Sequence, residues 1–220
     1  MRIGFVCRGK VGAFLKSGEG EEVDVLLFGM KGADEVYYEK ELDGATAVFE
    51  ETALLSKKYK SAVVCGCTTD ARGHKRRSAI VATGGRIAGV SDMLHAVDGE
   101  IGAGIGLHTY KTAVGNMGVV VDDDLRHPET VGALCAYDSD FIVCPYNEAD
   151  DKQIALIRAY AYCYGVPFLL CSNDYCAVAN ASGELTFSSP QSPAFVELTV
   201  TKEYHLVETR RKFVQCKSTK

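Results

Sequence analysis

Short, almost wholly apolar runs that alternate with helical patterns limit this chain to a layered α/β fold. The runs lie at residues 23–28, 61–65, 141–144 and 168–171. Because they lack the polar alternation of a half-exposed strand, they predict strands that are buried on both faces. Patterns of helical period lie between them, at residues 49–60, 128–135 and 153–164.

Glycine pairs add hairpins to this α/β order. Gly84-Gly85 separates two strand-like segments, 77–83 and 85–90, and Gly183 lies at the centre of another expected hairpin. Further strands are expected at residues 3–7, 111–114, 118–121, 195–200 and 205–208. A mixture of βα units and hairpins favours a sheet-and-helix sandwich over a purely doubly wound sheet.

The size and composition exclude several classes of protein. A chain of 220 residues with no linker or repeat fits one domain. The net charge of -5 argues against nucleic-acid binding, and no apolar run has the length of a membrane span. The first residues pass directly into a strand, without the apolar region of a signal peptide. Nine scattered cysteines form no disulfide framework, so we expect free thiols in the reducing cytoplasm.

Glycine motifs give a weak indication of nucleotide binding. Gly9 and Gly12 follow the first strand, but the full G-x-G-x-x-G pattern is absent, and Gly29-Met30 stands where an acidic residue is expected. A nucleotide-binding module therefore stays as the weaker alternative, and we expect no cofactor. The basic cluster at 72–77 suits either a solvated turn or a contact with phosphate or an acidic partner.

The acidic run 122–124 is the most unusual polar feature. Three carboxylates directly after an apolar strand are costly unless they are solvated, paired or bound to a cation, and His127 lies close by. The alternative is a solvated strand-to-helix corner. No C-x-x-C or G-x-S-x-G motif is present, and Cys67, just past a strand, is the best remaining candidate for a nucleophile.

Residues 118–129 resemble the nucleophile elbow of the nitrilase (carbon–nitrogen hydrolase) superfamily, whose pattern runs G-V-x-I-C-Y-D-x-x-F-P-E. The matching residues are Gly118, Val119, Asp124, Pro128 and Glu129. Residues 140–145 are similar to the A-D-L-I-x-x-P strand of that family, and residues 158–161 to its R-A-R-A helix. The resemblance covers nearly the whole chain and implies a single α-β-β-α sandwich domain over residues 1–220.

The resemblance also implies a Glu–Lys–Cys triad, of which no member is retained. In the family the thiolate attacks an amide or nitrile carbon, the glutamate transfers protons and the lysine stabilises the oxyanion. The three positions fall on Met30, Asp92 and Asp122 in this chain. We therefore expect a protein that is inactive as a cysteine amidase.

The two new carboxylates predict a binding site in place of the triad. We expect Asp92 and Asp122 to converge in the pocket and to hold an amine, a guanidinium group or a divalent metal, with the protein otherwise acting as a scaffold. The candidate ligand-binding residues are Asp92, Asp122, Asp124, His127 and Glu129.

One alternative is a divergent amide hydrolase that uses relocated groups such as Cys67, Asp122 or Glu129. Relatives in the family commonly form dimers through the helices that correspond to residues 128–135 and 153–164 here. The tyrosines at positions 160, 162 and 164 suit such an interface, so we expect a homodimer.

Overall fold

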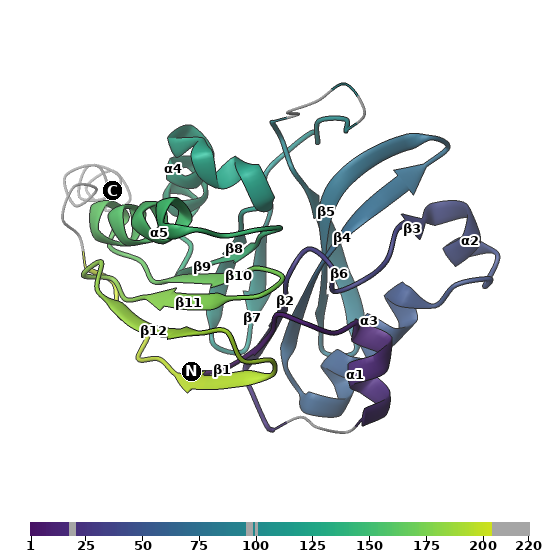
Figure 1. Ribbon diagram of the computed structural model, residues 1–220, viewed down its shortest axis with the longest axis horizontal. Coiled ribbons are helices and arrows are strands. Elements are labelled where there is room, and N and C mark those ends of the chain that lie inside the picture. Colours follow the sequence, from purple (N-terminus) through teal and green to yellow (C-terminus); the bar gives the residue numbers. More distant parts are fainter. Residues whose placement is uncertain (18–20, 96–98, 100, 204–220) are drawn as a thin grey trace, which may run out of the picture.

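The computed structural model describes residues 1–17, 21–95, 99 and 101–203, and its centre consists of two β-sheets packed face to face (Figure 1). The first sheet has the order β13-β1-β2-β4-β5-β6, with β3 paired to β4. Its strands are β1 (Arg2–Val6), β2 (Val25–Phe28), β3 (Val36–Tyr37), β4 (Ala62–Ala71), β5 (His74–Thr83), β6 (Arg86–Asp92) and β13 (Ala194–Glu197).

The second sheet has the order β12-β11-β10-β9-β8-β7. Its strands are β7 (Thr109–Thr112), β8 (Gly115–Val119), β9 (Phe141–Pro145), β10 (Phe168–Cys171), β11 (Cys176–Ala179) and β12 (Leu185–Ser189). The helices are α1 (Val11–Ser17), α2 (Tyr38–Leu42), α3 (Val48–Tyr59), the 3₁₀ helix η1 (Asp122–Arg126), α4 (Pro128–Ala136) and α5 (Asp151–Tyr164).

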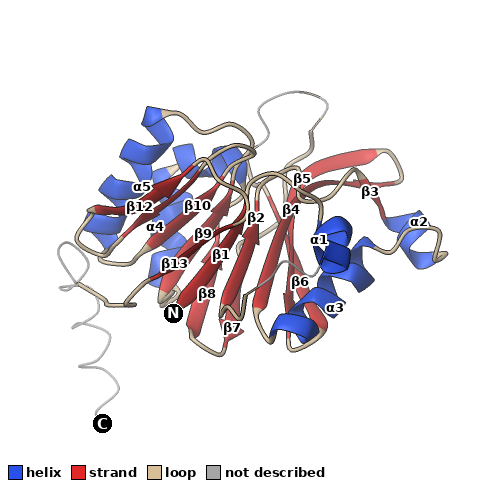
Figure 2. Ribbon diagram, turned by 60° about the horizontal axis from the view of Figure 1, so that its bottom comes forward, coloured by secondary structure: helices blue, strands red, loops and turns tan. Residues whose placement is uncertain are grey.

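Helices cover the outer face of each sheet, which completes the α-β-β-α sandwich (Figure 2). One apolar core lies between the sheets and includes Phe5, Leu27 and Phe141. A second core lies beneath α1 and α3, and a third beneath α4 and α5. The expected fold class is thereby confirmed, since each buried strand places side chains in two of these cores.

The alternation of side chains along β5 decides which of its residues can reach the space between the sheets. Ala79 and Val81 belong to the core between the sheets, whereas Ile80 and Ala82 belong to the core beneath α3. Successive residues of a strand point to opposite faces. Arg77 therefore points inward, toward the second sheet.

The parallel strands of both sheets end at the same edge of the sandwich. In the first sheet β1, β2 and β4 run parallel, and in the second β8, β9 and β10 do. Backbone hydrogen bonds join the segments that follow these strands, such as that from Met30 N to Tyr146 O at 3.3 Å. Polar groups just beyond several strands therefore meet at this edge.

Most of the expected elements are present, but β3, η1 and two further features were not expected. The Gly84-Gly85 turn has positive φ angles of 59° and 77°, as a tight hairpin requires. The basic cluster contains a second such turn, at Arg72 and Gly73, which lets β4 and β5 extend well beyond their expected ends. The other unexpected feature is the short polar helix α2. The strand expected at 205–208 lies outside the described residues.

None of the helices in the described ranges combines the length and the apolar character that crossing a membrane would need.

Candidate functional site

The acidic run forms a buried corner at the point where β8 leads into η1. Asp122 has a positive φ of 48°, a left-handed conformation that a non-glycine residue adopts only rarely. The turn directs its side chain inward, and only 1 % of that side chain is exposed. Strained backbone of this kind often lies at functional positions, and here it places a carboxylate between the two sheets.

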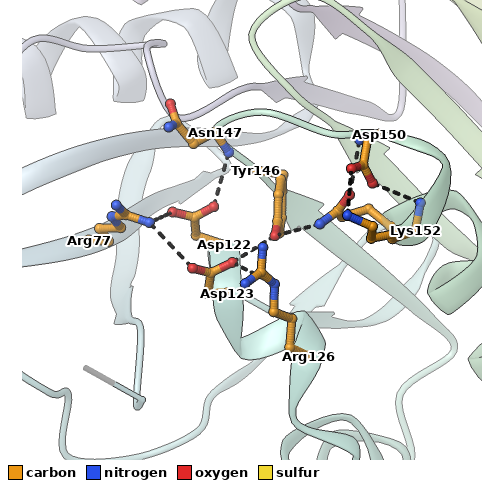
Figure 3. Close-up of polar contacts among 9 residues, drawn as sticks. Arg77, Asp122, Asp123, Arg126, Tyr146, Asn147, Asp150 and Lys152 are labelled. Carbon is orange, nitrogen blue, oxygen red and sulfur yellow. Dashed lines mark hydrogen bonds and ion pairs between the residues drawn. The ribbon is translucent and has the colours of Figure 1, made fainter. Parts of the chain in front are cut away.

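Arg77 and a backbone amide hold the Asp122 carboxylate (Figure 3). The Arg77 guanidinium donates to Oδ2 and forms an ion pair with it, and the Asn147 N–H donates to Oδ1 at 3.0 Å. Burial raises the pKa of Asp122, although the Asn147 N–H and the Arg77 charge both oppose that rise. Asp122, which was expected to bind an amine, a guanidinium group or a divalent metal as a ligand, is instead paired with an arginine of the protein itself.

Asp123 lies 3.9 Å from the same Arg77 guanidinium and joins it to further polar groups at this corner (Figure 3). The Tyr146 hydroxyl donates to its Oδ1 at 2.7 Å, and Arg126 Nε lies 3.1 Å from the same oxygen. Gln153 donates to the Tyr146 hydroxyl at 3.0 Å. Burial and the neighbouring Asp123 raise the pKa of Tyr146, so this phenol stays protonated and serves as a donor.

Asp124 is also buried, and it accepts three hydrogen bonds from the segment that follows β6. The donors are Leu94 N at 2.8 Å, His95 N at 3.0 Å and His95 Nδ1 at 2.8 Å. The His95 ring stacks on His127, and both rings lie beside Glu129. The structure therefore brings together three of the expected ligand-binding residues and adds His95, which the sequence analysis missed.

Asp92 does not join this site, so the expectation that it would converge with Asp122 is wrong. Its carboxylate accepts from Ser78 Oγ at 2.7 Å and pairs with Arg76 at 3.4 Å. Both partners point to the outer face of β5, opposite to Arg77, because they are one residue away from it along the strand. The solvated corner proposed for residues 122–124 is wrong as well, because Asp122 and Asp124 are both buried.

Two methionines occupy inward positions beside the acidic corner. Met30 follows β2 and Met93 follows β6, and both belong to the core between the sheets. A lysine directed from the end of β6 toward Asp122 would need the position of Met93 rather than that of Asp92. Thioether groups neither transfer protons nor carry charge, so these two positions supply no acid–base chemistry.

A cleft of about 480 Å³ opens at the same edge of the sandwich. It lies at the ends of β1, β2, β9 and β10 and is lined by Cys7, Arg8, Gly9, Lys10, Lys31, Glu148, Asn173 and Asp174. The Asn173 side chain connects segments around the cleft, since it accepts a hydrogen bond from Lys31 N at 3.0 Å and donates one to Asn147 Oδ1 at 2.7 Å. The backbone N–H of Asn147 also donates to Asp122, so Asn147 connects the cleft to the acidic corner.

The thiol in this cleft is Cys7, which the sequence analysis missed. Its Sγ lies 3.9 Å from Cys171 Sγ, and Cys171 pairs across the strands with Cys176. Hydrogen bonds from these two thiols lower the pKa of Cys7 to about 4. A run of alternating inward residues, Ile3, Phe5 and Cys7, could have indicated its direction.

The prediction of Cys67 as a candidate nucleophile is wrong. This residue is fully buried in the core beneath α3, away from the cleft, and burial raises its pKa well above the ordinary value of a thiol. A thiol without access or thiolate character cannot attack a substrate. Glu129, in contrast, is exposed at the start of α4, beside the two histidines.

The glycines after β1 do not form a phosphate cradle. Gly9 has a positive φ of 137° and lines the cleft, but the Glu51 carboxylate lies against Gly12. That carboxylate would repel a phosphate at the start of α1, which contains only 7 residues. The geometry thus weighs against the nucleotide-binding alternative.

Comparisons with known proteins identify the fold. No family model matches the sequence, and no curated protein matches it either. The structure is similar to Nit3 of Saccharomyces cerevisiae, a member of branch 10 of the nitrilase superfamily, with a TM-score of 0.78 and 15 % identity over 100 % of this chain and 95 % of that one.

Two further solved structures agree. A mutant amidase of Nesterenkonia sp. AN1 in complex with butyramide gives a TM-score of 0.76 at 15 % identity, over 99 % of this chain and 97 % of that one. A carbon–nitrogen hydrolase of Helicobacter pylori G27 gives 0.71 at 15 % identity, over 100 % and 95 % of the two chains. This chain therefore has the fold of the nitrilase superfamily along its whole length.

Proposed function

We propose that this protein is a nitrilase-fold protein that performs no cysteine-amidase chemistry and binds a small zwitterionic molecule in the cleft. One observation carries the first half of the proposal. The sequence resemblance assigns the cysteine position of the family's elbow to Asp122, which in the structure is a buried carboxylate held by Arg77 and by the Asn147 amide.

The requirements of acyl transfer explain why a paired carboxylate at this position argues against amidase chemistry. The reaction needs a strong nucleophile, a general base within hydrogen-bond reach and a cation or N–H group at the developing oxyanion. Asp122 is a weak nucleophile that is already paired, and the inward positions beside it are Met30 and Met93. The arrangement provides neither the base nor a free oxyanion-stabilising group at the elbow.

The charges of the cleft support the choice of ligand. Arg8 donates to Pro190 O at 2.7 Å and Lys10 pairs with Asp34, so both already have partners. Among the described residues no ion pair involves Lys31, Glu148 or Asp174. Arg8 also keeps its charge, because a backbone carbonyl does not neutralise a guanidinium group. Two acids and two cations, Glu148, Asp174, Lys31 and Arg8, around a cleft of this size suit a molecule that carries an amine and a carboxylate, such as an amino acid.

Thermal unfolding tests the binding proposal. The full chain is heated with amino acids, amino-acid amides, polyamines and nucleotides. Each compound is present at about 100 times the dissociation constant that the test is meant to detect. A ligand at that ratio stabilises the native state by about 2.7 kcal/mol, which raises the Tm by several degrees. The shift should disappear in Asp174→Asn and persist in Asp43→Asn, an exposed carboxylate on the C-terminal side of α2. A panel without any shift would leave the scaffold hypothesis as the better one.

Ammonia release tests the loss of amidase chemistry. Wild-type protein incubated with butyramide and with amino-acid amides should release ammonia no faster than the Asp122→Asn variant. The two proteins differ only at the elbow, so any activity that Asp122→Asn abolishes would show that the carboxylate takes part in hydrolysis. That result would contradict the proposal.

A divergent hydrolase remains a second candidate because of Cys7. This thiol lines the cleft, and hydrogen bonds from Cys171 and Cys176 lower its pKa to about 4, which favours the nucleophilic thiolate form. Activity that is lost in Cys7→Ser but kept in Asp122→Asn would favour this alternative over the binding function.

We further propose that the protein forms a homodimer in the cytoplasm through α4 and α5. Tyr160 and Tyr164 do share a face, with ring centroids 6.2 Å apart, and Tyr160 packs into the core. Tyr162, on the other side of α5, and Tyr137, after α4, are more than half exposed. Exposed tyrosines on this pair of helices support the interface.

A further inference from the structure

We propose that His95, His127 and Glu129 form a binding site for one divalent transition-metal ion of the zinc class. The site lies between the segment that follows β6 and the start of α4. It does not depend on the zwitterion-binding cleft or on the loss of amidase chemistry.

The first argument is the convergence of three Lewis bases. The Glu129 carboxylate oxygen lies 3.4 Å from His127 Nδ1 and 3.7 Å from His95 Nε2. One ligand atom from each residue lies within 4.8 Å of the other two. Four ligands at the ~2.0–2.2 Å of zinc–nitrogen and zinc–oxygen bonds stand about 3.3–3.6 Å apart in a tetrahedron, which matches two of these separations closely.

The second argument is the tautomer of His95. Its Nδ1–H donates to the Asp124 carboxylate, which also accepts two backbone N–H groups and is 1 % exposed. A proton on Nδ1 leaves the lone pair of a neutral ring on Nε2, facing Glu129. A carboxylate that fixes the ring in this way is the usual second shell of a metal-ligating histidine.

The third argument is electrostatic. The two imidazole rings are stacked with their centroids 3.5 Å apart and 4° between their planes. This arrangement brings His95 Nε2 and His127 Nδ1 to the same oxygen of Glu129, and the Asp124 carboxylate adds a second negative charge beside His95. A divalent cation is attracted by both carboxylates and binds imidazole nitrogen, so it fits this cluster.

The surroundings leave room for an ion and its remaining ligand. The side chains of His95 and His127 are 32 % and 36 % exposed, and that of Glu129 is 68 % exposed. Both rings can therefore rotate slightly out of their stack so that their lone pairs meet at one ion. Two nitrogen ligands favour zinc, nickel or cobalt over magnesium and calcium, which prefer oxygen.

Calorimetric titration of the tag-free full chain with zinc chloride tests the proposal. We expect one equivalent to bind, and the affinity to fall at least tenfold in His127→Gln and in Glu129→Gln. The matched control is His74→Gln, an exposed histidine at the start of β5, which should keep the wild-type affinity within twofold. Equal binding by wild type and His127→Gln, or no binding to wild type up to 1 mM zinc, would overturn the proposal.

Cobalt(II) distinguishes this site from the cysteines. Ligation by nitrogen and oxygen gives visible absorption bands without the intense near-ultraviolet thiolate-to-cobalt band, and we expect that spectrum from the wild type. A thiolate band that survives Glu129→Gln would place the ion elsewhere and refute the assignment. The Tm of each variant without metal should equal that of the wild type within about 2 °C, which shows that lost binding is not lost folding.

Discussion

Replacement of Arg77 by methionine should destabilise the protein severely, because it leaves a buried charge without its partner. The Asp122 side chain is 1 % exposed and would keep only the Asn147 N–H at 3.0 Å. Removal of one member of a buried ion pair costs about 3–5 kcal/mol. For a chain of this size that loss lowers the Tm by roughly 6–20 °C.

Urea denaturation at pH 7 measures the cost, and a double-mutant cycle assigns it to the pair. Asp122→Asn in the Arg77→Met background removes the second charge, and asparagine tolerates the left-handed backbone at this position. The double variant should therefore be more stable than the sum of the single effects by about 1–3 kcal/mol. Arg86→Met, which removes an exposed arginine of the same sheet, should change the stability by less than about 0.5 kcal/mol.

The cost should also depend on pH. Burial already raises the pKa of Asp122 above its unfolded value, and loss of the guanidinium would raise it further. A raised carboxyl pKa means that the folded state binds the proton more tightly than the unfolded state does. The contribution of Asp122 to the free energy of unfolding is therefore most favourable at low pH, and it is lost as the pH rises through the folded pKa. The deficit of Arg77→Met should thus be smaller at pH 5 than at pH 7. A deficit under 1 kcal/mol, additive single effects, or a cost that does not change with pH would refute the reasoning.

Three further predictions concern other parts of the fold. Iodoacetamide should label Cys7 nearly as fast at pH 5.5 as at pH 7.5, because the pKa of this thiol is lowered to about 4, while Cys67 stays unlabelled. Mass spectrometry of peptides measures the labelling, and slow labelling of Cys7 at both pH values would contradict the prediction. Gly66→Ala should cost about 1–3 kcal/mol in urea denaturation, because its Cβ would lie 2.7 Å from a backbone oxygen after β2; the matched Gly106→Ala meets no atom and should be nearly neutral. Tyr162→Asp should convert the proposed dimer into a monomer in analytical ultracentrifugation, and a wild type that sediments as a monomer would remove the dimer from the proposal.

The layers of the fold could be predicted from the sequence because the strands are buried on both faces. Such strands appear in the sequence as short apolar runs, whereas the α-helices of at least seven residues each bury one stripe of side chains. The pattern of apolar residues therefore distinguishes the strands from the helices. The extension of β4 and β5 was missed because its residues are polar and basic. The charges of residues 72–77 predicted a solvated turn over the whole cluster, whereas the turn occupies only Arg72 and Gly73, with φ angles of 54° and 82°, and His74 already begins β5.

The partners in the site could not be predicted, because they depend on strand direction to within one residue. A shift of one position moves a side chain from one face of the sheet to the other. Arg76 therefore pairs with Asp92 on the outer face, while Arg77 reaches Asp122 on the inner face. The sequence resemblance assigned the lysine position of the family to Asp92, whereas the inward residue at the end of β6 is Met93.

The partners of the three successive acids indicate what kind of site this corner can be. Burial of a carboxylate is prohibitive unless it is compensated, and here the buried Asp122 and Asp124 and the half-buried Asp123 all have partners. Arg77 from the first sheet pairs with Asp122, Arg126 pairs with Asp123, and His95 donates to Asp124. Two of these contacts join η1 to segments of the first sheet, so they hold the two sheets together at this corner. A catalytic nucleophile must be able to leave its ground-state contacts, and Asp122 could leave them only by unpairing a buried charge. The corner is therefore suited to rigidity and to holding its neighbouring histidines in place, as the proposed binding function requires.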